Sequence, residues 1–377
     1  MKKIRFDSFI KLNRGFDLPD SQIEEGIYPV VASTSIKAYH NEYKVEGPMV
    51  TTGRSGSLGK VVYIEGKCWP LNTTLYVKDF KGNVPRYVYY YLQMMHLEQF
   101  NAGVGVPTLN QNHLHSLKIL VHKKEQQQKI ASILSTYDTL IENNTKRIRL
   151  LEQMAENLYK EWFVRFRFPG HENVEMENGL PKGWKNCKVK EIYDTSSGGT
   201  PSRNKLEYFE GGNIPWIKTG ELQDCLIYKT EERITDDAVK HSSAKMIPSN
   251  SLVMAMYGVN IGKLGITTIV TTCNQACCVF KEKKYKSSRF YLFHYFKSIR
   301  EYLLSISFGA AQQNLSQELI KNIKIIVPDE ATLKAFEKKE QLFFNETLKL
   351  ELQNQLLTRQ RDLLLPRLMS GKLEVTV

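Results

Sequence analysis

Two long stretches of the chain carry apolar residues at the spacing expected of a helix that packs along another helix. Between Glu125 and Arg165, positions on one side step by four and three residues without a break, at Ile130, Leu134, Tyr137, Ile141, Asn144, Ile148, Leu151, Ala155, Leu158 and Trp162. A looser version begins near Pro328, with Leu333, Phe336, Phe343, Leu350, Asn354, Leu357, Leu364 and Leu368. This spacing predicts two long helices, each with a coiled-coil seam. Pro366 is expected to end or kink the second helix.

Each seam contains one asparagine, Asn144 in the first helix and Asn354 in the second. A polar residue at a core position lowers stability but fixes which residues face each other across a helix pair. Two long helices of matching pattern in one chain therefore favour pairing with each other. The alternative, in which each helix packs only on its own domain, stays open at this point.

The segment before each helix is rich in short runs typical of β-strands, at Met49–Thr52, Lys60–Ile64, Ser251–Met256 and Lys324–Val327. The two segments repeat each other: SLGKV at Ser57–Val61 corresponds to NIGKL at Asn260–Leu264, and KILV at Lys118–Val121 to KIIV near the second helix. Upstream of NIGKL the second copy is longer, which predicts an additional loop. Because the repeat is too long for a solenoid unit, we expect two homologous domains related by a pseudo-two-fold axis.

Turn-forming residues crowd the stretch from Phe168 to Trp184, including Pro169, Gly170 and Pro181. This composition predicts a linker followed by the start of the second domain. We therefore expect an α+β fold with a first globular domain over 1–122, a long helix over 123–168, a linker over 169–182, a second globular domain over 183–328, a long helix over 329–370 and a tail over 371–377.

The chain has 377 residues, a formal net charge of +12 and 42% hydrophobic residues. This apolar content is typical of a folded protein, and the positive charge, with the basic run Lys281–Lys286, is compatible with a polyanionic partner. No apolar run is long enough to cross a bilayer, and the basic start Met1–Phe6 leads into no signal-peptide core. The six cysteines lack C-x-x-C spacing, so we expect buried thiols in a reducing cytoplasm rather than a zinc site.

The candidate catalytic motifs are all incomplete. Gly53–Lys60 resembles a phosphate-binding loop but lacks the first glycine and the hydroxyl residue that should follow the lysine. Asp329 and Glu337 imitate a nuclease carboxylate set, but acidic residues are ordinary at a helix start. His113 and His115 have no apparent carboxylate or thiol partner for a metal. With no N-P-P-[YF] string for adenine methylation either, the sequence predicts no catalytic residue and no metal or cofactor site of its own.

Four stretches give the chain a family resemblance. LLLPRLMSGKL at Leu363–Leu373 and LYKEWFVRF at Leu158–Phe166 lie at the ends of the two predicted helices. GGTPSR at Gly198–Arg203, with IPWIKTGE at Ile214–Glu221, lies early in the second domain, and the fourth stretch is Val50–Gly59 with its duplicate. Together with the internal duplication, these stretches resemble the specificity subunits of type I restriction-modification systems.

The resemblance implies two target-recognition domains at opposite ends of an antiparallel coiled coil, each reading one half of a split double-stranded DNA site. It also implies that two methyltransferase subunits dock on the helices and that motor-nuclease subunits join them for restriction. S-adenosylmethionine would then be used by the methyltransferase, with no cofactor on this chain. The chain departs from longer members of the family because its first copy starts almost at Met1.

Residue type and position give candidates for both interfaces. Polar and basic residues of the duplicated loops and the GGTPSR and IPWIK stretches are candidates for DNA contact: Arg54, Ser55, Lys60, Arg203, Lys218, Tyr257, Asn260 and Lys263. Gln312, Gln313 and Asn314 suit either adenine readout or a structural turn. Large apolar residues of the helices are candidates for subunit contact: Trp162, Phe163, Phe343, Phe344 and Leu368.

Two other functions fit part of the same pattern. A coiled-coil transcription regulator with two DNA-reading domains would share the duplication and the charge. A scaffold that binds only protein would share the helices but would lack salt-dependent affinity for DNA. The duplicated loops themselves also suit turns that pack on their own sheets, with glycines present for backbone shape.

Overall fold

The computed structural model describes residues 1–283, 288–307 and 314–375. The chain divides into two compact units. Unit 1 comprises residues 1–144 and 353–377, and unit 2 comprises residues 145–352. Each unit therefore contains one globular domain together with a segment of each long helix, so the helices are parts of the units rather than separate domains.

Unit 1 is built from two sheets and a strand pair that closes the domain. The strand pair joins β1 (Lys2–Arg5) to β9 (Lys118–Val121) in antiparallel register. One sheet has the order β2 (Lys11–Arg14), β8 (Thr74–Asp79), β5 (Met49–Gly53) and β6 (Val61–Ile64). The other has the order β4 (Ile36–His40), β3 (Tyr28–Val31) and β7 (Trp69–Pro70). The short helices are α1 (Phe6–Phe9), α2 (Pro85–Met94) and α3 (Gln111–Ser116).

The core of unit 1 includes both long helices. Helix α2 begins with a proline at its first turn and buries one aromatic face, including Tyr87 and Tyr90. The same cluster contains Ile130 and Leu134 of the first long helix and Leu368 of the second. The ends of the two helices are thus fixed to this domain by buried apolar contacts.

Unit 2 repeats the plan of unit 1 with additional strands and short helices. A strand pair joins β12 (Lys185–Lys188) to β21 (Lys324–Val327), as β1 joins β9. The larger sheet has the order β13 (Tyr193–Ser197), β20 (Cys277–Glu282), β17 (Leu252–Ala255), β18 (Leu264–Thr267) and β15 (Cys225–Ile227), and the smaller has the order β16 (Glu232–Ile234), β14 (Ile214–Ile217) and β19 (Thr272–Cys273). The short helices are α5 (Val189–Ile192), α6 (Asp236–Lys240), α7 (Arg289–Ser298), α8 (Arg300–Ser307) and α9 (Gln317–Asn322).

The shared strand order confirms the duplication read from the sequence. Strand β15 has no counterpart at the edge of the larger sheet in unit 1, and it lies within the longer stretch of the second copy. A short hairpin of β10 (Met176–Glu177) and β11 (Leu180–Pro181) occupies the predicted linker.

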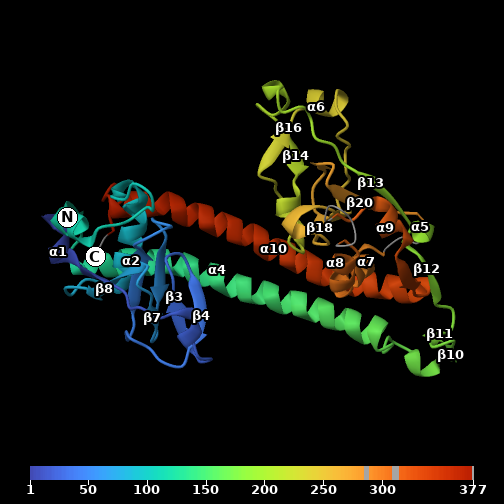
Figure 1. Cartoon of the computed structure of the whole chain (residues 1–377), viewed down its shortest axis with the longest axis horizontal. Helices are drawn as coiled ribbons and strands as arrows, with labels where there is room; N and C mark the ends of the chain where they lie inside the picture. The colour runs from blue at the N-terminus through green and yellow to red at the C-terminus, as the bar shows by residue number, and fades with distance from the viewer. Residues whose placement is uncertain (284–287, 308–313, 376–377) are drawn as a thin grey trace. The chain divides into compact units, whose positions relative to one another are not determined.

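The two long helices run antiparallel within each unit (Figure 1). They are α4 (Lys124–Tyr159), which continues as a π-helical turn over Lys160–Val164, and α10 (Glu330–Met369). In unit 1, Asp138 of α4 forms an ion pair of 2.7 Å with Arg361 of α10. In unit 2, Arg147 pairs with Glu346 at 2.8 Å. Partner numbers fall along α10 as they rise along α4, so the helices pair with each other while their ends also pack on the domains.

Helix α10 does not end at Pro366, because it continues through this residue to Met369. A proline within a helix removes one N–H donor and usually bends or ends the helix. Here Pro366 lies in the last turn, and the N–H of Ser370 donates to its carbonyl oxygen over 3.1 Å. Burial of Leu368 and Met369 in the core of unit 1 holds this turn in place.

The two seam asparagines meet in unit 1. The side-chain amide of Asn144 is buried and donates to Oδ1 of Asn354 over 3.0 Å and to Oε1 of Gln353 over 3.2 Å. Leaving one buried amide without a hydrogen-bond partner lowers the free energy of unfolding by more than the hydrogen bond contributes to it. The asparagine pair therefore fixes the register of α4 against α10.

Replacing one asparagine is expected to destabilise the chain more than replacing both. Asn144→Leu should lower the free energy of unfolding by about 1–2 kcal/mol, because it leaves Asn354 without its donor. The double variant, Asn144→Leu with Asn354→Leu, should recover most of that loss through apolar contact. Urea unfolding followed by circular dichroism measures both values, and purely additive losses would show that the two amides are not coupled.

Candidate nucleic-acid interface

In unit 1, two loops join into one platform. The first, residues 54–60, follows the buried strand β5, and the second, residues 101–108, precedes α3. The N–H of Gly56 donates to the carbonyl of Pro107 over 2.9 Å, and the N–H of Leu109 donates to the carbonyl of Arg54 over 2.8 Å. Backbone hydrogen bonds thus hold the two loops at a fixed separation.

The candidate cations of this platform keep their charge available. Nε of Arg54 donates to the carbonyl of Asn72 over 2.9 Å, which anchors a half-buried side chain. Lys60 is exposed. Neither residue forms an ion pair with a carboxylate in the described part of the chain. Ser55 contributes backbone contacts, since its carbonyl accepts a hydrogen bond of 3.1 Å from Ser33.

In the matching loop of unit 2, the candidates Tyr257, Asn260 and Lys263 differ in exposure and in their partners. Tyr257 is 37% exposed and forms a backbone bridge with Asn314. Asn260 is only 8% exposed, and its side-chain amide donates to the carbonyl of Thr219 over 2.9 Å. This corrects the expectation that Asn260 is displayed, because its amide satisfies a neighbouring turn instead. Lys263 is half-buried and donates to Oε1 of Gln223 over 2.8 Å.

Arg203 and Lys218 are both held by one carboxylate. Glu232 accepts from Arg203 over 2.6 Å and from Lys218 over 3.0 Å. The two cations lower the pKa of Glu232, and hydrogen bonds to Glu231 and Glu232 raise the pKa of Lys218. The Arg203 guanidinium also lies 5.0 Å from the ring centre of Trp216. The GGTPSR and IPWIK stretches therefore contact each other, and this contact stabilises the smaller sheet of unit 2.

Some sequence candidates lie outside the described residues. These are Gln312, Gln313 and the last three residues of the basic run, Lys284–Lys286. Of the histidines considered for metal binding, His115 is buried and accepts from the N–H of Leu12 over 3.1 Å, whereas His113 is exposed. No cluster of three or more potential metal ligands occurs among residues 1–283, 288–307 and 314–375.

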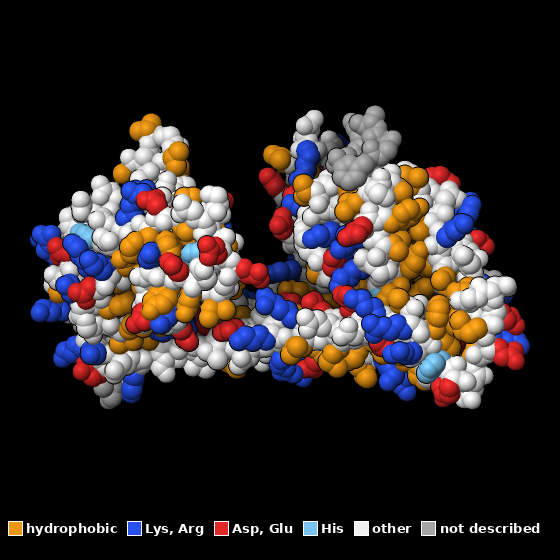
Figure 2. Space-filling view, turned by 60° about the horizontal axis from the view of Figure 1, so that its bottom comes forward, with side chains coloured by type: hydrophobic (Ala, Val, Ile, Leu, Met, Phe, Trp, Pro, Cys, Tyr) orange, Lys and Arg blue, Asp and Glu red, His pale blue; other side chains and the backbone are white. Residues whose placement is uncertain are grey.

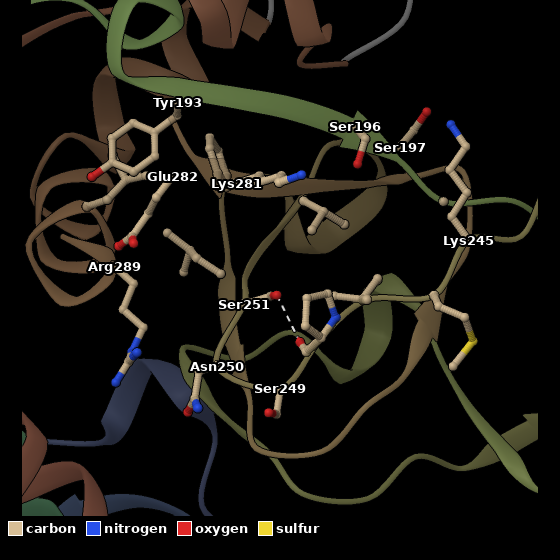
Figure 3. Close-up of a pocket in the computed structure, with 18 residues that line it drawn as sticks. Tyr193, Ser196, Ser197, Lys245, Ser249, Asn250, Ser251, Lys281, Glu282 and Arg289 are labelled. Carbon is tan, nitrogen blue, oxygen red and sulfur yellow. Dashed lines mark hydrogen bonds between the residues drawn. The ribbon is translucent and has the colours of Figure 1, made fainter. Parts of the chain in front are cut away.

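A cavity of about 440 Å³ in unit 2 was not singled out from the sequence. Hydroxyl and basic side chains line it between β13, β20 and the loop before β17, and Figure 3 shows Lys281 and Lys245 with Ser196 and Ser197 along one side. Its third cation, Arg289, points to Glu337 of α10, 3.3 Å away. The lining also includes the carboxylate of Glu282 and apolar side chains such as Leu252 and Phe280, and the only advance signal for the cavity was the basic run that contains Lys281.

The candidates for subunit contact are mostly core residues, which corrects the sequence expectation. Trp162, Phe163, Phe344 and Leu368 are between 2% and 7% exposed, and Phe343 is half-buried. The ring of Phe163 lies 4.7 Å from that of Phe336 and 4.8 Å from that of Tyr291. These side chains fix the helices to their domains and leave little surface for a partner.

Other apolar residues of the helices are exposed. In unit 1, Ile133 and Leu140 of α4 are 37% and 42% exposed, and Leu356 and Leu363 of α10 are 59% and 61% exposed. Both pairs are spaced by seven residues, so each lies on one side of its helix. In unit 2, Leu150 and Met154 of α4 and Leu342 and Leu352 of α10 are also exposed, but the two leucines of α10 are ten residues apart and do not follow the seven-residue spacing. We call these residues the exposed helix stripes. Figure 2 shows one face of the molecule, on which hydrophobic side chains lie among charged ones.

Two further findings bear on the class of protein. No helix in the described part of the chain is long and apolar enough to cross a membrane. The six cysteines form no disulfide, and burial raises the pKa of the Cys68 and Cys278 thiols to about 12. Such thiols are poor nucleophiles.

Comparison with known proteins decides the family. The family model described as the type I restriction modification DNA specificity domain matches residues 1–153 and 181–355, once for each copy of the duplication. The chain belongs to this family. Membership confirms the resemblance of the sequence motifs and places the protein among DNA specificity subunits rather than among coiled-coil transcription regulators.

Curated members of the specificity-subunit family align over most of the chain. The chain is 27% identical to the type I restriction enzyme MjaIX specificity subunit of Methanocaldococcus jannaschii, over 78% of this chain and 70% of that protein. It is 26% identical to the HindI specificity subunit of Haemophilus influenzae, over 71% of each. The solved S subunit of the type I restriction-modification system from M. genitalium covers 100% of this chain and 96% of its own length, with a TM-score of 0.67 and 16% identity. That similarity supports the fold.

Proposed function

We propose that this specificity subunit reads a two-part, asymmetric DNA sequence and directs methylation of adenine and cleavage by partner subunits. The observation that carries the proposal is the duplication of one domain plan with different loops. The two units share the order of their common strands, but the platform loop of unit 1 has Arg54 where the loop of unit 2 has Tyr257, while a lysine is kept at Lys60 and Lys263. Two copies of one scaffold with different loop chemistry would read two different half-sites.

Charge supports DNA as the ligand. The chain has a formal net charge of +12, and duplex DNA attracts basic surfaces through release of its counterions. In unit 1, Arg54 and Lys60 add cations that no carboxylate in the described residues neutralises. In unit 2, the cations Arg203 and Lys218 are neutralised by Glu232, so we assign them a supporting role in the domain.

The exposed helix stripes support docking of two methyltransferase subunits, one on each unit. Apolar side chains at regular spacing on a helix are costly in water and are typical of surfaces that another protein covers. Exposed apolar residues occur on both long helices in both units, which fits two copies of one partner. Motor-nuclease subunits would join this assembly for restriction. S-adenosylmethionine would bind to the methyltransferase, and the complex would act on DNA in the cytoplasm.

The purified chain is expected to transfer no methyl group and cut no DNA by itself. Methyl transfer from tritiated S-adenosylmethionine to plasmid DNA should begin only when a methyltransferase subunit that assembles with the chain is added. Omitting this chain from the mixture is the matched control and should also abolish transfer to the recognised site. Methylation by the chain alone would contradict the proposed division of labour.

A further inference from the structure

The second platform loop of unit 1 is braced into one shape. Oδ1 of Asn101 accepts from the N–H of Gly103 over 2.9 Å and from the N–H of Thr108 over 2.8 Å. The N–H of Ala102 donates to the carbonyl of Thr108 over 2.9 Å. Together with the hydrogen bond from Gly56 to Pro107, these contacts fix both ends of the loop, and its tip projects from the domain.

The tip of this loop displays two valines. Val104 is fully exposed and Val106 is 60% exposed. A single exposed apolar residue is ordinary on a protein surface. Here two valines alternate with Gly103, Gly105 and Pro107 on a braced loop, so the backbone is shaped to hold apolar groups away from the domain.

Charged groups beside the tip favour a nucleic acid over an apolar partner. Arg54 and Lys60 belong to the first platform loop, which is hydrogen-bonded to the second platform loop through Gly56 and Pro107. One carboxylate close to the first platform loop, Glu98, lies beside Gly59 and pairs with His96 at 3.3 Å. Phosphates would meet the cations, while the valines would reach the edges of the bases.

Unit 2 has a valine on its own platform loop. Val259 is fully exposed in the turn Gly258–Asn260, beside the partly exposed Tyr257. Both glycines of this turn region, Gly258 and Gly262, have positive φ values of 78° and 75°, so the turn shape depends on glycine. An apolar side chain at the platform is thus present in both units.

We propose that the Val104–Val106 tip contacts the C5-methyl group of a thymine in the half-site read by unit 1. This methyl is the apolar group that B-DNA exposes in the major groove, and small apolar side chains are its usual partners. The inference rests on the proposed function and adds a base preference to it. The tip discriminates an A·T pair by apolar contact, with Arg54 and Lys60 holding the phosphates.

Uracil substitution tests the proposal, since uracil differs from thymine only by this methyl group. The complex of the chain with its methyltransferase is titrated with fluorescent duplexes carrying the motif found by methylome sequencing, with each thymine of one half-site replaced in turn. One replacement is expected to weaken wild-type binding about fourfold, the effect of one lost buried methyl. The Val104→Ser and Val106→Ser double variant should bind thymine and uracil duplexes equally.

Ile27→Ser is the matched control, because Ile27 is 78% exposed elsewhere in unit 1. This variant should keep the wild-type preference for thymine. If the wild-type complex prefers its motif but tolerates uracil at every position, the thymine contact is overturned and the proposed function stands. If the wild-type complex shows no sequence preference, the proposed function fails and the inference fails with it.

Discussion

Replacing residues 183–327 with the corresponding segment of another specificity subunit is expected to change one half of the methylated sequence and leave the other unchanged. Both junctions lie at one strand pair, because Lys185 of β12 faces Val327 of β21. The exchanged segment therefore enters and leaves the domain at adjacent points. It carries the whole of both sheets of unit 2, while both long helices keep their sequence.

Methylome sequencing of cells that express the exchange variant with the original methyltransferase measures the result. The matched control is the exchange of residues 1–122, which should change the other half-site. Alteration of both half-sites by either single exchange would show that the domains do not read DNA independently.

A charge in the exposed helix stripe of unit 1 is expected to abolish binding of the methyltransferase. Leu140→Glu with Leu356→Glu should weaken association by about 100-fold or more, because a buried interface would have to desolvate two unpaired carboxylates. Both leucines are more than 40% exposed, so the free chain should fold normally. Co-purification from cells expressing both proteins, with a thermal melt of the free variant, measures the two effects.

Ile27→Glu is the control for a charge on an exposed apolar residue outside the helices, and it should leave co-purification intact. Phe163→Glu should behave differently from both, because Phe163 is buried among aromatic rings and the variant should lose stability rather than a partner. Retained binding by the double leucine variant would remove the stripe from the proposed interface.

The helices and the duplication could be predicted because both appear as regular patterns in the amino-acid sequence. Heptad spacing identified the seam, and the two asparagines in it form a hydrogen bond in the structure. The same pattern could not tell an exposed apolar residue from a buried one beside the seam. Phe163 and Phe344 are buried by domain residues distant in sequence, such as Tyr291 and Phe290, and periodicity carries no information on such contacts.

Site residues were harder to predict because residue type does not reveal exposure or partners. Asn260 has the chemistry of an adenine reader but is buried against Thr219. Arg203 and Lys218 have the charge of phosphate ligands but share Glu232, which is far from Arg203 in the sequence. The valines at positions 104 and 106 look like core residues in sequence and are exposed by the bracing of Asn101.

Single-molecule methylome sequencing of cells carrying the chain and its methyltransferase, compared with cells lacking only this chain, shows whether the chain selects the methylated site. Methylated adenines are expected in one bipartite motif, with two different half-sites separated by unspecified bases, and this motif should disappear when the chain is removed. A continuous or palindromic motif, or methylation that persists without the chain, would contradict the proposed function.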